Sequence, residues 1–132
     1  MTAAPLLERY FQHFAAGDAA AAADLFAANG LYEFPFLRPR LVGRAEIRAG
    51  HARAFAVAGP VAIALRAVKS DKAVAITEGR MTAHVARDGC DIDIPFAAVA
   101  ESADGKLQRL SIYCDAHPFR LWTDGPVMAF GA

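Results

Sequence analysis

The sequence of 132 residues predicts an α+β domain in which helices cover one face of a mainly antiparallel sheet. The first 58 residues carry apolar side chains at helical spacing, whereas residues 61–117 form long apolar segments separated by turn residues. Helices followed by an antiparallel meander are typical of the α+β class. We therefore expect one domain over residues 1–132: a mainly helical part with one short strand (1–58), an antiparallel meander (61–117) and a C-terminal tail (118–132).

The helical part divides into three expected helices. The first starts near Pro5, which suits a first helical turn, and ends at Gly17. Asp18 caps the second, which we expect to run through an alanine-rich stretch to Phe26 and to end at Asn29-Gly30. The third spans about Ala45 to Val57. Apolar spacing places these residues on the inner face of the first helix: Leu6, Leu7, Tyr10, Phe11 and Phe14.

A short strand is expected at Leu31–Phe34, and the two prolines that follow, Pro35 and Pro39, confine the next residues to a loop or an edge. Three turns with Ser-Asp-Lys, Asp-Gly and Asp-Gly sequences separate the longer segments of the second half. The strands are expected near Val61–Lys69, Ala73–Ala86, Asp91–Glu101 and Leu107–His117.

Charge and composition limit the classes of function. Lysine plus arginine equals aspartate plus glutamate at 14 each, so there is no electrostatic field to recruit nucleic acid or an anionic membrane. A hydrophobic content of 55% with no net charge favours self-association, and we expect a homodimer. No apolar run is long enough to span a membrane and the N-terminus has no secretion signal, so we expect a cytoplasmic protein. Cys90 and Cys114 are expected to be buried free thiols.

The end of the last expected strand carries an unusual row of polar residues. Strand alternation places Ser111, Tyr113, Asp115 and His117 on one face, and apolar residues including Cys114 on the other. The polar face is either wet or lines a cavity in which its titratable groups meet a ligand. The sequence shows no metal-ligand spacing, glycine-rich phosphate loop or nucleophile elbow, so we expect no metal and no cofactor.

The order of the elements and several landmarks resemble the nuclear transport factor 2-like superfamily, which includes ketosteroid isomerases and SnoaL-like polyketide cyclases. The matching features are Arg9-Tyr10, Ala16-Gly17-Asp18, Leu25-Phe26-Ala27, Tyr32-Glu33-Phe34-Pro35, Gly43-Arg44-Ala45-Glu46-Ile47, Asp104-Gly105-Lys106-Leu107 and Tyr113-Cys114-Asp115. The resemblance implies a cone-shaped fold, with a strongly curved sheet around the helices, an apolar pocket between them, and dimerisation through the outer sheet face.

The resemblance also implies positions for site residues. Tyr10 would point into the cone, Glu33 would lie near its mouth, and Asp115 would lie near the end of the last strand. Ketosteroid isomerases pair a carboxylate base with a tyrosine and a protonated acid, but the two acid positions fall on Phe34 and Ala97 here. A steroid isomerase is therefore not expected.

The SnoaL-like cyclases match better, because their acid near the end of the last strand corresponds to Asp115. Their accompanying histidine falls near Glu101, and His117 or His84 would have to replace it. We expect the protein to bind a hydrophobic small molecule. One hypothesis is that it is also an enzyme, a cofactor-independent isomerase, cyclase or lyase that acts on a carbonyl compound by acid–base chemistry. A non-catalytic ligand-binding or dimerisation module is the alternative.

The candidate catalytic residues are Asp115 as acid or base, Tyr10 as hydrogen-bond donor to an oxyanion, and His117 as an auxiliary group. Each has a structural alternative: Asp115 as a solvated strand-end carboxylate, Tyr10 and His51 as satisfied core residues, Glu33 as an edge charge. The candidate pocket residues are Glu33, Phe34, His51, Tyr113 and Trp122, with Phe34 and Trp122 also able to fill the pocket.

Overall fold

A computed structural model of the chain describes residues 2–37, 40–58, 61–85 and 89–115. Helices and strands follow the expected order, with the helices concentrated in the first half and the long strands in the second. Their bounds are α1 Ala3–Ala16, α2 Ala19–Asp24, β1 Phe26–Glu33, β2 Arg40–Val42, α3 Arg44–Ala58, β3 Val61–Leu65, β4 Lys69–Asp71, β5 Val74–Val85, β6 Cys90–Ala103 and β7 Lys106–Cys114. The α+β class is confirmed.

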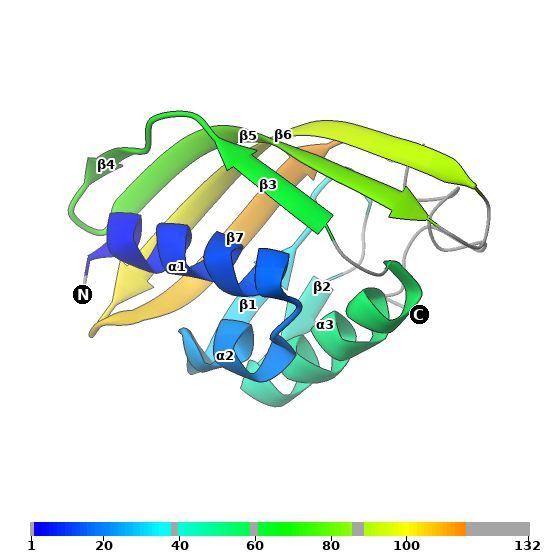
Figure 1. Cartoon of the computed structure of the whole chain (residues 1–132). Coiled ribbons are helices and arrows are strands. Elements are labelled where there is room, and N and C mark those ends of the chain that lie inside the picture. The colour runs from blue at the N-terminus through cyan, green and yellow to red at the C-terminus, as the bar shows by residue number, and fades with distance from the viewer. Residues whose placement is uncertain (1, 38–39, 59–60, 86–88, 116–132) are drawn as a thin grey trace.

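Seven strands of the described chain form one sheet, in the order β2-β1-β7-β6-β5-β3, with β4 paired to the other end of β5. Every pairing is antiparallel except that of β1 with β7, which is parallel. The sheet curves over the helices, with α1 against its concave side and α3 beside β1 and β2 (Figure 1). This arrangement is the curved sheet that the sequence resemblance implies.

Local sequence signals explain the ends of the first two helices. Gly17 adopts a left-handed conformation with φ of 70°, and its N–H donates to the carbonyls of the last turn of α1. The Asp18 side chain accepts a hydrogen bond from the N–H of Ala21 and so caps α2. Both expectations are confirmed.

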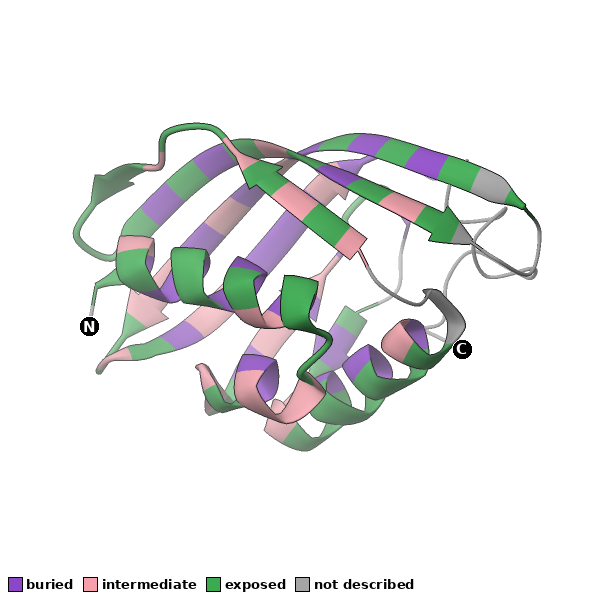
Figure 2. Ribbon diagram, viewed as in Figure 1, coloured by how far each residue is buried: buried purple, intermediate pink, exposed green. Residues whose placement is uncertain are grey.

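The core lies between the concave side of the sheet and the helices. The buried stripes of α1 and of the long strands face each other in Figure 2. The apolar face predicted for α1 is buried along its whole length: Leu6, Leu7, Tyr10, Phe11 and Phe14. In β7 the predicted apolar side chains Leu110, Ile112 and Cys114 are buried, and Ser111 between the first two is buried as well.

Several predicted boundaries were wrong. The second helix ends at Asp24 rather than at Asn29-Gly30, and β1 already begins at Phe26. Long-range bonds cause this: Phe26 pairs with Leu107 of β7, and the Arg44 guanidinium donates to the Phe26 carbonyl at 2.8 and 3.0 Å. These contacts override the helix propensity of the preceding alanines.

The strand expected at Val61–Lys69 is instead two short strands, β3 and β4, each pairing with a different half of β5. The strand β2 was not predicted, because its three residues follow a proline-containing loop and form a strand only by pairing with β1.

The last strand ends at Cys114, so Asp115 follows the strand, and His117 lies outside the described residues. The predicted tail at 118–132 also lies outside them. No helix in the described part of the chain is long and apolar enough to cross a membrane.

Candidate functional site

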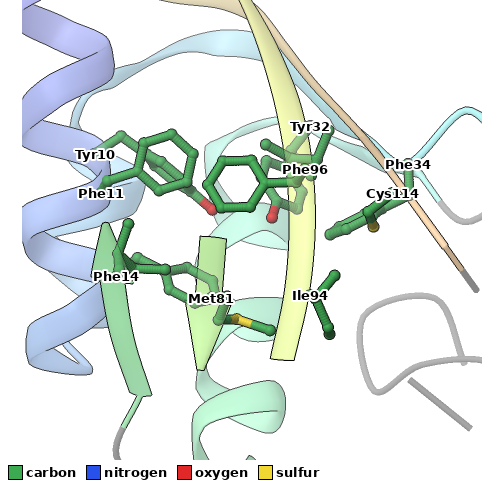
Figure 3. A pocket seen from close by; sticks show the side chains of 11 residues that line it. Tyr10, Phe11, Phe14, Tyr32, Phe34, Met81, Ile94, Phe96 and Cys114 are labelled. Atoms are coloured by element: carbon green, nitrogen blue, oxygen red, sulfur yellow. The ribbon is translucent and has the colours of Figure 1, made fainter. Parts of the chain in front are cut away.

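An apolar cavity lies between α1 and the concave side of the sheet. Its volume is about 30 Å³, room for about two water molecules. Figure 3 shows side chains from α1, β1 and the long strands converging on it. The lining residues of the described chain are Tyr10, Phe11, Phe14, Tyr32, Phe34, Ile63, Met81, Ile94, Phe96, Ile112 and Cys114. Aromatic side chains fill most of the space, as the sequence allowed.

The oxygen atoms in this wall belong to two tyrosines. Among the described lining side chains, only Tyr10 and Tyr32 carry an oxygen or nitrogen atom. Tyr10 comes from the inner face of α1 and Tyr32 from β1, and their ring centroids lie 5.8 Å apart. Their hydroxyl groups are drawn red in Figure 3. The described lining of the cavity is therefore apolar except for the hydroxyl groups of Tyr10 and Tyr32.

Behind Tyr10, the fully buried His51 is hydrogen-bonded both to the Tyr10 hydroxyl and to the backbone of α3. The hydroxyl of Tyr10 lies 2.8 Å from Nε2 of His51, and Nδ1 of His51 lies 2.7 Å from the carbonyl oxygen of Ile47. A carbonyl oxygen can only accept, so Nδ1 carries the ring proton and Nε2 is the acceptor in the neutral ring. Tyr10 therefore donates its proton to His51.

Burial determines the charge states of His51 and of the two tyrosines. Desolvation lowers the pKa of His51 to about 4, against a smaller opposing effect of its hydrogen bond to the Ile47 carbonyl, so the imidazole is neutral at pH 7. Desolvation likewise raises the pKa of Tyr10 and of Tyr32 well above the usual range for a phenol. Tyr10, Tyr32 and His51 are therefore all neutral at pH 7, and these side chains can interact with a ligand through hydrogen bonds but not through charge.

The outer face of the sheet carries a separate polar cluster. The guanidinium of Arg109 bonds to Glu33 and to Glu101, each at 3.1 Å, and reaches the Tyr113 hydroxyl at 3.5 Å. Ser111 donates to Glu33 at 2.8 Å. Burial alone would lower the pKa of Arg109, but the hydrogen bond to Glu33 and the two carboxylate charges raise it instead. Arg109 is therefore a fixed cation that offsets part of the negative charge of Glu33 and Glu101.

This cluster corrects the expected positions of two pocket residues. Glu33 and Tyr113 were expected near the pocket, but both lie on the face of the sheet opposite the cavity. The pairing of Glu33 with Ser111 and of Tyr32 with Leu110 shows why. Strand alternation sends Tyr32 inward and therefore Glu33 outward. Tyr113 instead has an edge-to-face contact with the exposed ring of Phe36.

Asp115 lies just beyond the end of β7 and is exposed to solvent. It does not line the cavity, but it follows Cys114, which does. Burial raises the pKa of the Cys114 thiol to about 12, and the nearby Asp115 charge adds to the shift. Cys114 is a buried free thiol, as expected. The carboxylate of Asp115 is therefore exposed, outside the cavity lining and close enough to Cys114 to act on its thiol.

The structure brings together only part of the predicted site. Tyr10 and Phe34 line the cavity and His51 supports Tyr10, while His117 and Trp122 lie outside the described residues. Sequence reasoning missed Tyr32 as a cavity hydroxyl. The alternation of Tyr32, Glu33 and Phe34 could have identified it, because it sets Tyr32 and Phe34 on one face.

Among residues 2–37, 40–58, 61–85 and 89–115, no group of three or more histidine, cysteine or acidic side chains could hold a metal ion.

Solved structures with the same fold are numerous. A protein from Catenulispora acidiphila with a ketosteroid isomerase-like fold, in complex with trimethylamine, superposes with a TM-score of 0.81, at 17% identity over 95% of this chain and 96% of its own. A protein from Jannaschia sp. CCS1 assigned as a SnoaL-like polyketide cyclase gives 0.73, at 14% identity over 95% of each chain. An epoxide hydrolase of M. tuberculosis gives 0.73, at 15% identity over 86% of this chain and 83% of its own.

The family match over residues 7–110, together with these folds, confirms the nuclear transport factor 2-like superfamily that the sequence resemblance had indicated. Residues 7–110 match the model of the SnoaL-like domain, and the chain belongs to that family. A comparison with curated proteins gives no significant match.

Proposed function

We propose that the protein binds a small, mainly apolar molecule that carries one hydrogen-bonding group, in the cavity beneath α1. The observation that carries the proposal is the wall itself: an apolar lining of aromatic, aliphatic and sulfur-containing side chains around the hydroxyls of Tyr10 and Tyr32. Ligand sites are typically of this kind, apolar with a few convergent polar groups. The buried His51 holds Tyr10 in place.

The cavity must open to admit such a molecule, because about 30 Å³ is far below the roughly 300 Å³ of a typical ligand pocket. Two side chains offer the room. Met81 is unbranched and adapts easily, and Phe96 stacks on Phe11 with ring centroids 5.1 Å apart. Phe11 also separates the cavity from an open surface groove between α1 and β3, which shares Phe11 and Ile63 with the cavity. A ligand that displaces the Phe11 ring enters from this groove.

The test is a titration of methyl-labelled protein with cyclohexanol, followed by NMR. Shifts should concentrate on methyl groups of Met81, Ile94 and Ile112, which line the cavity. Arg109→Met is a matched control on the outer face of the sheet and should bind cyclohexanol like the wild type. Saturable shifts confined to the outer face, or none at all, would contradict the proposal.

Acid–base catalysis on a carbonyl compound, of the isomerase or cyclase kind, is the second candidate. Its support is the position of Asp115 next to Cys114, a cavity-lining residue whose thiol its charge reaches. Asp115 would exchange a proton with a ligand that protrudes from the cavity. Tyr10 donates to His51 in the present structure, so its expected role as donor to an oxyanion requires that bond to break. Asp115→Asn should lose most turnover with little change in melting temperature; full turnover in this variant would exclude Asp115.

Self-association is proposed for the outer face of the sheet. Val74 and Ile76 of β5 are 39% and 47% exposed there, and large apolar side chains on a surface favour contact with a partner. A homodimer through this face would cover both. Ile76→Glu should then shift the molar mass measured by light scattering from the dimer toward the monomer, and an unchanged mass would place the contact elsewhere.

A further inference from the structure

We propose that the groove between α1 and β3 binds an extended peptide segment of a partner protein, which pairs with β3 as an additional strand. This groove is the open surface groove that adjoins the cavity, and its volume is about 520 Å³. Adding a strand to the edge of a sheet is a common mode of peptide recognition. The proposal does not depend on which ligand the cavity binds.

The strand β3 lies at one end of the sheet. In the described part of the chain it pairs with β5 on one side and with no strand on the other. Figure 1 shows β3 at the border of the sheet, with α1 beside it. The side of β3 that points away from β5, here called the free edge, can therefore be reached by a strand from another molecule.

A hydrogen bond next to β3 identifies the backbone groups that point to the free edge. The N–H of Arg66 donates to the carbonyl of Glu78 in β5 at 2.8 Å. In antiparallel pairing every second residue bonds to the neighbouring strand, and the residues between point their N–H and C=O groups the other way. Ala64 therefore bonds toward β5, whereas the backbone groups of Ile63 and Leu65 point to the free edge. No described hydrogen bond outside the helices and strands involves these edge groups.

The sequence of β3 lacks the features that usually protect a sheet edge. Charged residues, prolines and very short strands keep natural edges from pairing with other chains. The strand β2 has three residues and starts at the exposed Arg40, and β4 has three residues from Lys69 to Asp71. The strand β3 has five residues, Val-Ala-Ile-Ala-Leu, with neither a charge nor a proline. Of these three edges, β3 is the best suited to accept a partner strand.

The groove beside the free edge has room for the side chains of an added strand. Phe11 of α1 and Ile63 and Leu65 of β3 belong to the apolar part of its lining. Glu8 and Arg66 add one charge of each sign, so the groove repels neither an acidic nor a basic segment through net charge. Strand alternation directs every second side chain of the partner to the apolar lining. The partner segment is therefore extended, with apolar residues at alternate positions.

The first test is an NMR titration of the whole chain with the peptide acetyl-Lys-Val-Thr-Val-Thr-Val-Glu-amide. The amide resonances of Ile63 and Leu65 should shift saturably. Two control peptides are N-methylated at the valines or at the threonines, so each lacks the N–H groups of one side of the backbone. One of them should lose at least about tenfold in affinity, and the other should bind like the parent peptide. Equal affinities of the two control peptides, or no binding of the parent peptide, would overturn the proposal.

The second test compares Leu65→Pro with Leu65→Ala. Both variants lose the leucine side chain, but only proline also removes the N–H that points to the free edge, where a sheet tolerates proline. Leu65→Pro should bind the parent peptide about tenfold more weakly than Leu65→Ala, and equal affinities would overturn the proposal.

Hydrogen exchange of the free wild type gives a reading that needs no variant. The amides of Ile63 and Leu65 should exchange faster than that of Ala64, and the parent peptide should slow them. Equal protection of all three amides in the free protein would show that another segment or a second copy already covers the edge, and it would overturn the proposal. Cyclohexanol binding tests the proposed function separately.

Discussion

Lowering the pH from 7.5 to 5 should destabilise the folded protein through His51. Its ring is fully buried, which lowers its pKa to about 4, whereas the same residue in the unfolded chain titrates near 6.5. Between these two pH values the unfolded state binds a proton that the folded state does not. A group whose folded-state pKa is depressed contributes stability that is complete above the unfolded pKa and is lost as the pH falls toward the folded pKa.

The magnitude follows from the two pKa values. The free energy of unfolding falls by at most about 1.4 kcal/mol per pH unit for one proton. Integration from pH 7.5 to pH 5 gives a loss of about 2 kcal/mol from His51 alone. The residue is inaccessible to solvent, so screening by water does not reduce this figure.

Urea denaturation of the wild type and of His51→Phe at pH 7.5, 6.5, 5.75 and 5 measures the effect. Carboxylates titrate in both proteins, so they cancel in the difference, and the wild type should lose about 2 kcal/mol more than the variant over this range. Equal losses in the two proteins would refute the reasoning. So would an NMR titration that finds His51 protonated in the folded state at pH 6.

Three further outcomes follow from the same structure. Tyr10→Phe leaves Nε2 of His51 without its donor and should lower the free energy of unfolding by about 1–3 kcal/mol in urea denaturation, and no loss would show that the bond is not formed in solution. Gly79→Ala would place a methyl group 2.6 Å from the ring of Phe96 and 2.9 Å from a backbone oxygen, and it should cost about 1–3 kcal/mol and shift the methyl resonances of the cavity; an unperturbed spectrum would contradict this packing. Cys114 should resist alkylation at pH 8 until the protein unfolds, because its thiol is buried and its pKa is raised to about 12; rapid labelling in the folded protein, read by peptide mass spectrometry, would contradict this burial.

Local signals in the sequence were sufficient for much of the fold. The apolar spacing from Leu6 to Phe14, the stop at Gly17 and the cap at Asp18 depend on neighbouring residues, and each has the predicted role. The end of the second helix does not depend on neighbours alone. It is decided by the pairing of Phe26 with Leu107, more than eighty residues away, which helix propensity cannot register.

The candidate site was less predictable, for a similar reason. Alternation assigned Ser111 and Tyr113 to one face of the last strand, but only the assembled sheet shows that this face points away from the helices. Tyr10 and His51 are 41 positions apart, and nothing in either helix alone indicates that they form one hydrogen-bonded pair. The small cavity volume depends on how rings from α1, β1 and β6 interlock. The sequence shows how many aromatic rings the protein has, but their positions around the cavity follow only from the packing of the folded chain.

The most direct test of the account is a crystal structure of the protein grown with cyclohexanol. We predict density for the ring between Met81 and Phe96, with its hydroxyl within hydrogen-bond distance of the Tyr10 or the Tyr32 oxygen. A ligand bound only outside the cavity, or a cavity that stays empty at saturating cyclohexanol, would contradict the proposed binding function.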